Sequence, residues 1–144
     1  MSTLSEVLER KGGGVVTVSC DSTVRDAIRK MSDANIGAVV AVENDKAIGI
    51  FTERDYLRKI TLAGRSSNDT VISEVMSSPL ITATPEESSR DAMGTMTERR
   101  CRHLVIMDEE EMVGIVSQGD LVKHLLLQKE AEVEQLSGYI AGNY

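Results

Sequence analysis

The stretch Gly-Ile-Phe-Thr-Glu-Arg-Asp at residues 49–55 occurs a second time, as Gly-Ile-Val-Ser-Gln-Gly-Asp at residues 114–120. In each copy the apolar end of a strand is followed by a hydroxyl side chain, by a carboxylate three positions later and by an amphipathic helix. The copies are offset by 65 residues, so that Thr52 corresponds to Ser117 and Asp55 to Asp120. A duplicated Ser/Thr-x-x-Asp at a strand-to-helix junction is therefore the feature that the fold must explain.

The same offset relates most of the remaining chain without a gap. Residues 25–27 (Arg-Asp-Ala) correspond to residues 90–92, and the agreement extends to Thr17 with Thr82, Met31 with Met96, and Val40 with Val105. Internal similarity at a fixed long period indicates a repeat architecture. Each unit reads as β-α-β-β-α and is too small to bury its own sheet. We expect an α/β (α+β) fold in which two such units pack face to face as a pseudo-twofold pair.

The first unit is predicted to contain three strands and two helices. Strands are indicated at residues 15–18, 38–42 and 47–51 by β-branched or apolar runs. The first helix is expected to start from Asp21 or Ser22 as its N-cap and to end at Ile36-Gly37. Its apolar positions at helical spacing are Val24, Ala27, Ile28, Met31 and Ala34. The second helix is predicted from Thr52 to residue 63, with an inward face formed by Tyr56, Leu57 and Ile60.

The segments outside the two units carry signals of their own. Short helices are predicted at residues 4–10, before the glycines at 12–14, and at residues 71–76. The end of the chain is expected to be a helix laid on a surface of the same chain or of a partner, through Ala131, Val133, Leu136, Tyr139 and Ile140. The predicted divisions are an N-terminal segment at 1–14, repeats at 15–66 and 79–127, a linker at 67–78 and a helical tail at 128–144.

Composition narrows the class of protein. The chain has 144 residues, enough for one ordinary domain, and its net charge of −7 argues against general nucleic-acid binding, which needs a basic face. Cys20 and Cys101 lie far apart without metal-type spacing, so we expect buried free thiols in a reducing compartment. No window reaches the roughly 18 apolar residues of a membrane span. The first residues lack the pattern of a signal peptide, and we expect a cytoplasmic protein without membrane contact.

The repeated junction has two interpretations. As a helix cap, the hydroxyl accepts from an amide of the first turn and the acid lies near the positive helix end. As a binding site, the free amides of the helix start suit a phosphate, and the carboxylate suits a vicinal diol of ribose. Residues 99–103 (Arg-Arg-Cys-Arg-His) add a basic cluster to an acidic protein. Arginine suits bidentate contact with phosphate, although a basic helix end has the same composition.

The pattern resembles a tandem pair of cystathionine-β-synthase (CBS) domains, also called a Bateman module. The resemblance covers about residues 15–127 and is carried by the two Gly-Ile-x-Thr/Ser-x-x-Asp motifs at 49–55 and 114–120. Further matching positions are Thr17, Thr82, Asn35-Ile36-Gly37-Ala38-Val39-Val40, Glu74-Val75-Met76-Ser77 and Arg102-His103-Leu104. Two motifs in register across a whole repeat make the match specific. The strand after Arg102-His103-Leu104 departs from it, because family members often carry Pro where this chain has Val105.

The resemblance implies two clefts at the pseudo-twofold interface, each able to bind an adenosine compound. In the family the Asp typically holds the ribose diol and the Ser/Thr a phosphate, while adenine lies against apolar groups partly from the other repeat. Carried over by position, one cleft would use Thr17, Ile36, Gly37, Ala38, Ile115, Ser117 and Asp120. The other would use Ile50, Thr52, Asp55, Thr82, Arg102 and His103. Arg54 faces the second cleft where the other copy has Gly119, so the second cleft is better suited to several phosphates.

The resemblance therefore implies a regulatory sensor of adenosine-containing nucleotides: AMP, ADP, ATP, NAD or S-adenosylmethionine. It would signal through an unidentified protein partner or through its oligomeric state, and we expect a homodimer. No catalytic cofactor and no metal are expected. The alternative is a dimerisation scaffold without ligand, in which the motifs serve only as caps. A third hypothesis is an enzyme using Asp55 or Asp120 as a base near His103, but no nucleophile elbow, Walker loop, metal cluster or GxGxxG motif occurs.

Overall fold

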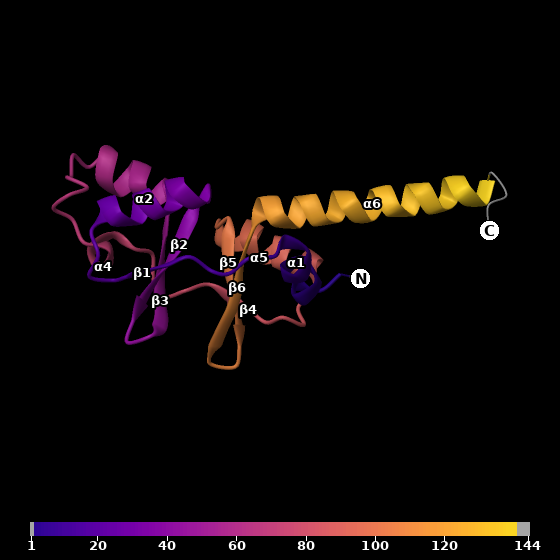
Figure 1. Cartoon of the computed structure of the whole chain (residues 1–144), viewed down its shortest axis with the longest axis horizontal. Coiled ribbons are helices and arrows are strands. Elements are labelled where there is room, and N and C mark those ends of the chain that lie inside the picture. The colour runs from indigo at the N-terminus through magenta and orange to yellow at the C-terminus, as the bar shows by residue number, and fades with distance from the viewer. Residues whose placement is uncertain (1, 141–144) are drawn as a thin grey trace.

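The computed structural model describes residues 2–140, with side chains as far as residue 138. It contains two three-stranded sheets, which Figure 1 shows next to each other with their hairpins pointing the same way. The first sheet has the order β1 (Thr17–Ser19), β2 (Ala38–Glu43) and β3 (Lys46–Thr52), and the second β4 (Thr82–Ala83), β5 (His103–Asp108) and β6 (Glu111–Ser117). In both, the first two strands are parallel and the last two antiparallel. The predicted pair of β-α-β-β-α units is confirmed.

The long crossover helices start from hydroxyl caps. α2 (Val24–Ala34) is capped by Thr23, whose side chain accepts from the Asp26 amide, and α5 (Ser89–Arg99) by Ser88 in the same way. The prediction of Asp21 or Ser22 as the cap is wrong, because these residues form the turn after β1, where their amides bond back to Ser19. α2 ends at Asn35, directly before the predicted stop at Ile36-Gly37, and α5 ends at Arg100. Both Asn35 and Arg100 are in the left-handed conformation.

The helix after β3 differs from its prediction. It begins as α3 (Glu53–Asp55) and continues as a π-helical segment, η1 (Tyr56–Thr61). A π-turn is wider than the α-turn on which the inward face was predicted. Ile60 is buried and Tyr56 half-buried against the first core, as predicted, but Leu57 is 54% exposed. Leu57 therefore faces outward, toward the space between the units.

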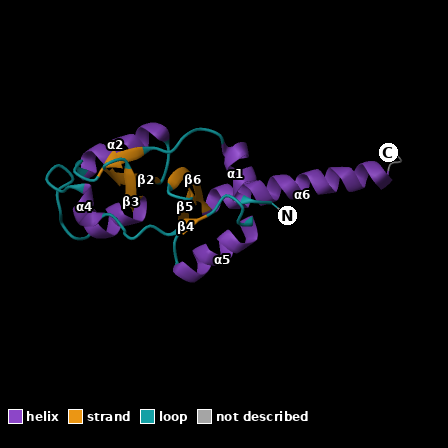
Figure 2. Ribbon diagram, turned by 90° about the horizontal axis from the view of Figure 1, so that it is seen from below, coloured by secondary structure: helices purple, strands orange, loops and turns teal. Residues whose placement is uncertain are grey.

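Each unit borrows part of its core from the segment that precedes the other. α1 (Leu4–Lys11) packs on the second unit, where Leu4 and Val7 join the core around Leu104. α4 (Ile72–Val75) packs on the first unit, where Ile72 and Val75 are buried in its core. Equivalent backbone hydrogen bonds hold both segments in place. The Leu4 amide donates to the Glu87 carbonyl (2.8 Å), and the Ile72 amide donates to the Ser22 carbonyl (2.9 Å). Figure 2 shows α1 and α4 at opposite ends of the pair of sheets.

Close packing of these segments requires two glycines in the sheets. A Cβ added at Gly49 would lie 2.6 Å from Met76 Sδ, and one at Gly114 would lie 2.6 Å from Leu8 Cδ2. Gly49 and Gly114 are equivalent positions of the two repeats. Because these two residues have no side chain, Met76 after α4 lies directly on β3, and Leu8 of α1 lies directly on β6.

The last helix, α6 (Gln118–Ile140), has 23 residues and extends far beyond the rest of the chain (Figure 1). The tail is helical as predicted, but within the described side chains it is not laid on its own chain, since Val133 and Leu136 are 60% and 63% exposed. Ala131 is exposed as well. The side chains of Tyr139 and Ile140 lie outside the described residues. No helix in the described part of the chain has the length and apolar character needed to cross a membrane.

Candidate functional site

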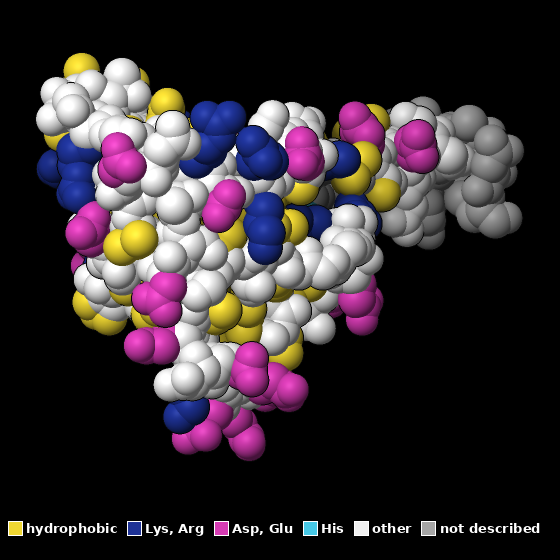
Figure 3. All heavy atoms as spheres, turned by 60° about the vertical axis from the view of Figure 1, so that its left-hand side comes forward, with side chains coloured by type: hydrophobic (Ala, Val, Ile, Leu, Met, Phe, Trp, Pro, Cys, Tyr) yellow, Lys and Arg dark blue, Asp and Glu magenta, His cyan; other side chains and the backbone are white. Residues whose placement is uncertain are grey.

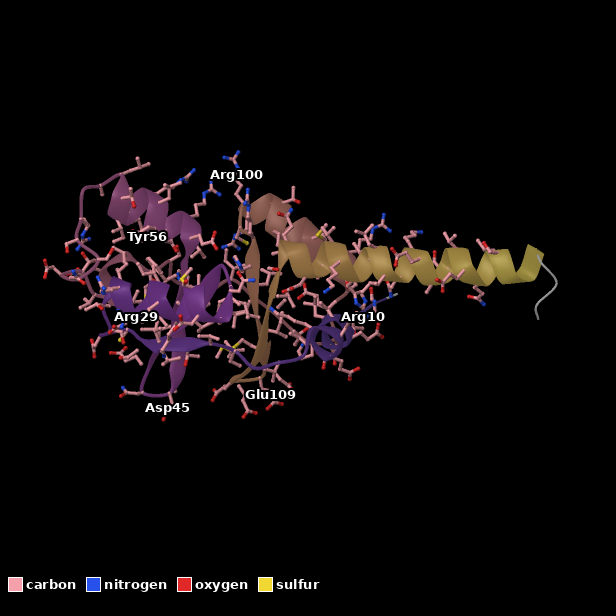
Figure 4. The ribbon with its side chains drawn as sticks, turned by 45° about the horizontal axis from the view of Figure 1, so that its top comes forward. Arg10, Arg29, Asp45, Tyr56, Arg100 and Glu109 are labelled. Carbon is pink, nitrogen blue, oxygen red and sulfur yellow. The ribbon has the colours of Figure 1, made fainter. Side chains whose placement is uncertain are left out.

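A cavity of about 840 Å³ lies between the two units and is lined by both. This volume is within the range of small-molecule sites, roughly 300–1,000 Å³. The first unit and the linker contribute Gly37, Ile50, Thr52, Glu53, Arg54, Asp55, Tyr56, Leu57 and Ser77; the second unit contributes Pro79, Leu80, Ile81, Arg99, Arg100, Cys101, Arg102, His103 and Val105. Figure 4 shows Arg100 above the first strands of the second unit, on the side facing Tyr56 of the first. A ligand here would contact both repeats.

The wall formed by the first unit contains the Thr52–Asp55 junction. Thr52 Oγ1 accepts from the Asp55 amide (3.1 Å), and Asp55 Oδ2 accepts from the Thr52 amide (3.0 Å) and hydroxyl (3.1 Å). These reciprocal bonds form a capping box. In the second unit Ser117 and Asp120 make the same pair of backbone bonds at 2.9 and 3.0 Å. The capping interpretation is confirmed at both junctions.

The second oxygen of Asp55 is also occupied. Asp55 Oδ1 accepts from Ser77 Oγ (3.0 Å) and from Lys59 Nζ (3.1 Å). Lys59 Nζ also donates to the Val75 carbonyl (2.9 Å), which ties the carboxylate to the linker. A carboxylate offers about four lone-pair sites, and Asp55, only 8% exposed, has all of them engaged. A ribose diol can bind Asp55 only by displacing one of the side-chain donors, Ser77, Lys59 or the Thr52 hydroxyl.

The opposite wall is basic. Arg99, Arg100 and Arg102 line the cavity from the second unit, and Arg54 lies beside Asp55 on the first. Within the described residues none of these four arginines is in an ion pair. In Figure 3, Lys and Arg side chains gather across the upper part of the face shown, whereas Asp and Glu side chains dominate its lower edge. Guanidinium groups that are not neutralised by neighbouring carboxylates attract and bind phosphate oxygens. This wall can therefore hold an anionic ligand.

His103 lies where the two units meet. Burial lowers its pKa, the charges of Lys11 and Arg102 lower it further, and Asp120 and Glu53 partly oppose them. The ring is therefore neutral at neutral pH. A Cβ added at Gly37 would be 3.2 Å from Glu53 Oε1 and 3.9 Å from His103 Nε2, so Gly37 lies beside both side chains. The Gly37 carbonyl accepts from the Glu53 amide at 3.0 Å, which joins this contact to the start of α3.

Of the residues assigned to the second predicted cleft, Ile50, Thr52, Arg54, Asp55, Arg102 and His103 all line the large cavity. Thr82 does not line it, because it is exposed on β4 and its neighbour Ile81 faces the cavity instead. Gly37 was assigned to the other cleft but lies here. The prediction did not assign Ser77 to a cleft, although it ends the matching segment Glu74-Val75-Met76-Ser77, and it missed Pro79 and Leu80, which carry no motif signal. Cys101 is a half-buried free thiol, not buried like Cys20, and burial raises its pKa.

The residues assigned to the other predicted cleft lie in several separate places in the structure. Ile36 packs against the first core, Ala38 is buried in β2, and the Thr17 carbonyl in β1 accepts from Lys30 Nζ. Ile115 lines a cavity of about 390 Å³ next to the glycines at 12–14, and Asp120 lines another of about 110 Å³. Ser117 is half-buried in the junction.

Lys11, at the end of α1, neutralises Asp120. Its Nζ lies 2.8 Å from Asp120 Oδ2 and donates to the Ile115 carbonyl at 2.8 Å. Burial raises the pKa of Asp120, but the Lys11 hydrogen bond, the Ser117 amide and the Lys11 charge outweigh burial, so the pKa lies below its ordinary value. The two repeated carboxylates thus differ: the linker covers Asp55, and the N-terminal helix supplies a cation to Asp120.

Comparisons with known proteins agree with this architecture. The family model of the CBS domain matches residues 3–62 and 72–127. The chain is 40% identical to the CBS domain-containing protein CBSX3, mitochondrial, of Arabidopsis thaliana, over 99% of this chain and 74% of that protein. It is 35% identical to the CBS domain-containing protein YhcV of Bacillus subtilis, over 89% and 91%. A solved structure of a putative signal-transduction protein with CBS domains from Burkholderia ambifaria matches with a TM-score of 0.84 and 38% identity, over 88% of this chain and 95% of that one.

Proposed function

Because the chain belongs to the CBS-domain family and carries two tandem copies of the domain, we propose that it is a regulatory module that binds one adenosine-containing nucleotide in the cavity between them. The observation that carries the proposal is the pairing of two chemistries in one cavity. A carboxylate, Asp55, and Arg54 lie on one wall, and Arg99, Arg100 and Arg102 lie on the other; among the described residues none of the four arginines is in an ion pair. A nucleotide is a ligand that needs both groups at once.

The ligand's parts have natural places in this cavity. The phosphates lie against Arg54, Arg99, Arg100 and Arg102, and the ribose diol takes over oxygens of Asp55. The base packs on the apolar side chains of the lining, which are Ile50, Tyr56, Leu57, Leu80, Ile81 and Val105. Of the candidate ligands, those with several phosphates (ATP, ADP or NAD) use the arginines more fully than AMP or S-adenosylmethionine. Thr52 keeps its capping bonds and offers its hydroxyl to a phosphate.

Ligand binding would be transmitted through the linker. When a diol displaces Ser77 Oγ or Lys59 Nζ from Asp55, the Lys59 bond to the Val75 carbonyl changes with it. Val75 belongs to α4, which packs in the first core. A ligand shifts such an equilibrium only by its different affinity for the two arrangements. The linker is therefore the element whose position reports ligand occupancy.

We further propose a homodimer formed through α6. Positions 122, 126, 129, 133 and 136 repeat at intervals of four and three residues, as on a coiled-coil seam, and four of them are apolar. Those four, Val122, Leu126, Val133 and Leu136, are 42–63% exposed in the chain alone. A second copy covers them, with Lys129 in the seam. Sedimentation should give a dimer that Leu126→Glu with Leu136→Glu converts to a monomer; a wild-type monomer at high micromolar concentration contradicts the dimer.

The nucleotide proposal is tested by calorimetry and thermal unfolding with AMP, ADP, ATP, NAD and S-adenosylmethionine. A ligand that binds the folded chain raises its midpoint by linkage. Arg100→Gln should weaken binding of the multiply phosphorylated ligands about tenfold, while the matched control Arg90→Gln, exposed on α5 outside the cavity, should not. If no adenosine compound binds at millimolar concentration, the scaffold alternative replaces the sensor.

We propose that the module itself is not an enzyme. Ligands incubated with the protein should be recovered unchanged, and time-dependent conversion that an active-site variant abolishes would contradict this. A cytoplasmic location also stays a prediction, which imaging of the tagged protein in its own cells tests. The protein that responds to the module has to be found by its ligand-dependent binding.

A further inference from the structure

A smaller cavity of about 110 Å³ lies between α1 and α6 and shares no lining residue with the large one. Val7, Arg10 and Lys11 line it from α1, and Asp120, Lys123 and His124 from α6. Figure 4 shows Arg10 on α1, beneath the start of α6. The cavity is separate from the proposed nucleotide site.

His124 is an unusual lining residue for this cavity. The side chain is only 4% exposed, and neither Nδ1 nor Nε2 has a hydrogen-bond partner among the described residues. A buried polar group without a partner destabilises a fold by about 1–3 kcal/mol. Burial lowers the pKa of His124, Arg10 lowers it further, and Glu6 opposes them. The ring is therefore neutral at neutral pH, and one of its two buried nitrogens carries an N–H that can donate.

The repeat explains why His124 lacks a partner. His124 corresponds to Lys59 of the first unit at the offset of 65 residues. Lys59 binds Asp55 in its own helix, four residues earlier. In the second unit Lys11 has taken that place on Asp120, arriving from α1. His124 is left at the equivalent position without a hydrogen-bond partner among the described residues, although it lines the same cavity as Asp120.

The charges around the cavity favour an anion. Lys11 and Asp120 neutralise each other in their ion pair. Arg10 and Lys123 also line the cavity, and within the described residues no carboxylate is ion-paired with either. Glu6, on α1, is the nearby acid that acts on His124. The start of the 23-residue helix α6 adds its positive dipole end.

We propose that this cavity binds one tetrahedral oxyanion: phosphate, sulfate or the phosphoryl end of a small phosphomonoester. His124 donates a hydrogen bond to it, and Arg10 and Lys123 balance its charge. The cavity of about 110 Å³ is several times the roughly 30 Å³ share of one water molecule and too small for a nucleoside. The anion also lies beside Lys11, the residue that is ion-paired with Asp120.

The chain has two histidines, and one lies in each cavity. The ring ¹⁵N and ¹H resonances therefore report the two sites independently in the full-length protein. Inorganic phosphate is titrated against chloride at constant ionic strength, and sulfate and glycerol 3-phosphate are titrated in parallel. His124→Gln assigns the two sets of signals. Arg10→Gln tests the site through an exposed side chain, and Arg100→Gln is the matched control in the large cavity.

We expect saturable movement of the His124 resonances, weakened about tenfold or more in Arg10→Gln and retained in Arg100→Gln. Binding of inorganic anions alone identifies a free oxyanion as the ligand, and binding of glycerol 3-phosphate as well identifies a phosphomonoester. The proposal is overturned if His124 does not respond, if only His103 responds, or if Arg10→Gln responds like the wild type. Failure of nucleotides to bind the large cavity would leave this result unchanged.

Discussion

Replacing Lys11 by Met should remove the cation that neutralises Asp120. The Lys11–Asp120 pair is 2.8 Å long, and its side chains are 32% and 24% exposed. Exposed ion pairs contribute about 0.2–1 kcal/mol. Lys11 is partly shielded and also donates to the Ile115 carbonyl, so we expect a loss of about 1 kcal/mol of unfolding free energy. For a chain of this size that lowers the melting midpoint by about 3 °C.

Urea unfolding at several pH values measures this effect and its sign. The pKa of folded Asp120 is depressed, so its contribution is present above the unfolded value of about 3.9 and is lost as pH falls through the folded pKa. The gap between wild type and Lys11→Met should be constant from about pH 7 to 5 and narrow below about pH 4. Arg65→Met, which breaks the exposed Arg65–Glu74 pair, is the matched control and should cost less. Equal losses in the two variants, or a gap independent of pH, would refute the reasoning.

Three further predictions concern the fold. Gly49→Ala should lower the free energy of unfolding by about 1–3 kcal/mol, because the added Cβ meets Met76 Sδ and the Ser77 carbonyl. Gly94→Ala, on the open surface of α5, should raise it by about 0.5–1 kcal/mol. Chemical denaturation measures both, and similar effects of the two variants would contradict the close packing at Gly49. Thr23→Ala should lower the free energy of unfolding by about 1 kcal/mol, because it removes the N-cap of α2, whereas Ser22→Ala should change it little. The reverse order in urea titrations would support Ser22 as the cap, as predicted from the sequence. Both histidines should titrate below about 6.5 by NMR, so that stability falls as pH drops from that value toward their folded pKa values; titration above it would be inconsistent with their burial.

The duplicated motif was sufficient to predict the architecture. An offset of 65 residues between Thr52–Asp55 and Ser117–Asp120 predicted two equivalent sheets, and the strand registers repeat at that offset, with Thr17 opposite Val40 and Thr82 opposite Val105. Local signals of this kind depend on residues close together in sequence, which is why caps and strands are readable. The exceptions are also local: the π-turns that expose Leu57 and the cap at Thr23 differ from their predictions by a small change in helix geometry or position.

The basic half of the candidate site was also visible in the sequence, since Arg99, Arg100 and Arg102 are neighbours. Their opposition to Arg54 and Asp55 across one cavity came from the packing of the two units. Pro79 and Leu80 line the cavity without any motif signal, and the segment that contains Ser77 matched the family without indicating a place in a cleft. The positions of these residues depend on where α4 docks. Backbone and side-chain contacts over such separations follow from loop closure and core packing rather than from a local pattern.

The sequence by itself determined the two-repeat fold and the pair of carboxylates, Asp55 and Asp120, that take part in the helix caps. Only the tertiary structure decided that these carboxylates differ. Leu4, Val7 and Leu8 of α1 take the places on the second unit that Ile72, Val75 and Met76 take on the first. These segments are offset by 68 residues rather than 65, so the repeat register does not align them. The exchange delivers Lys11 to Asp120 and Ser77 to Asp55, and it leaves His124 without a hydrogen-bond partner in the described part of the chain, because each unit is completed by the segment that precedes the other.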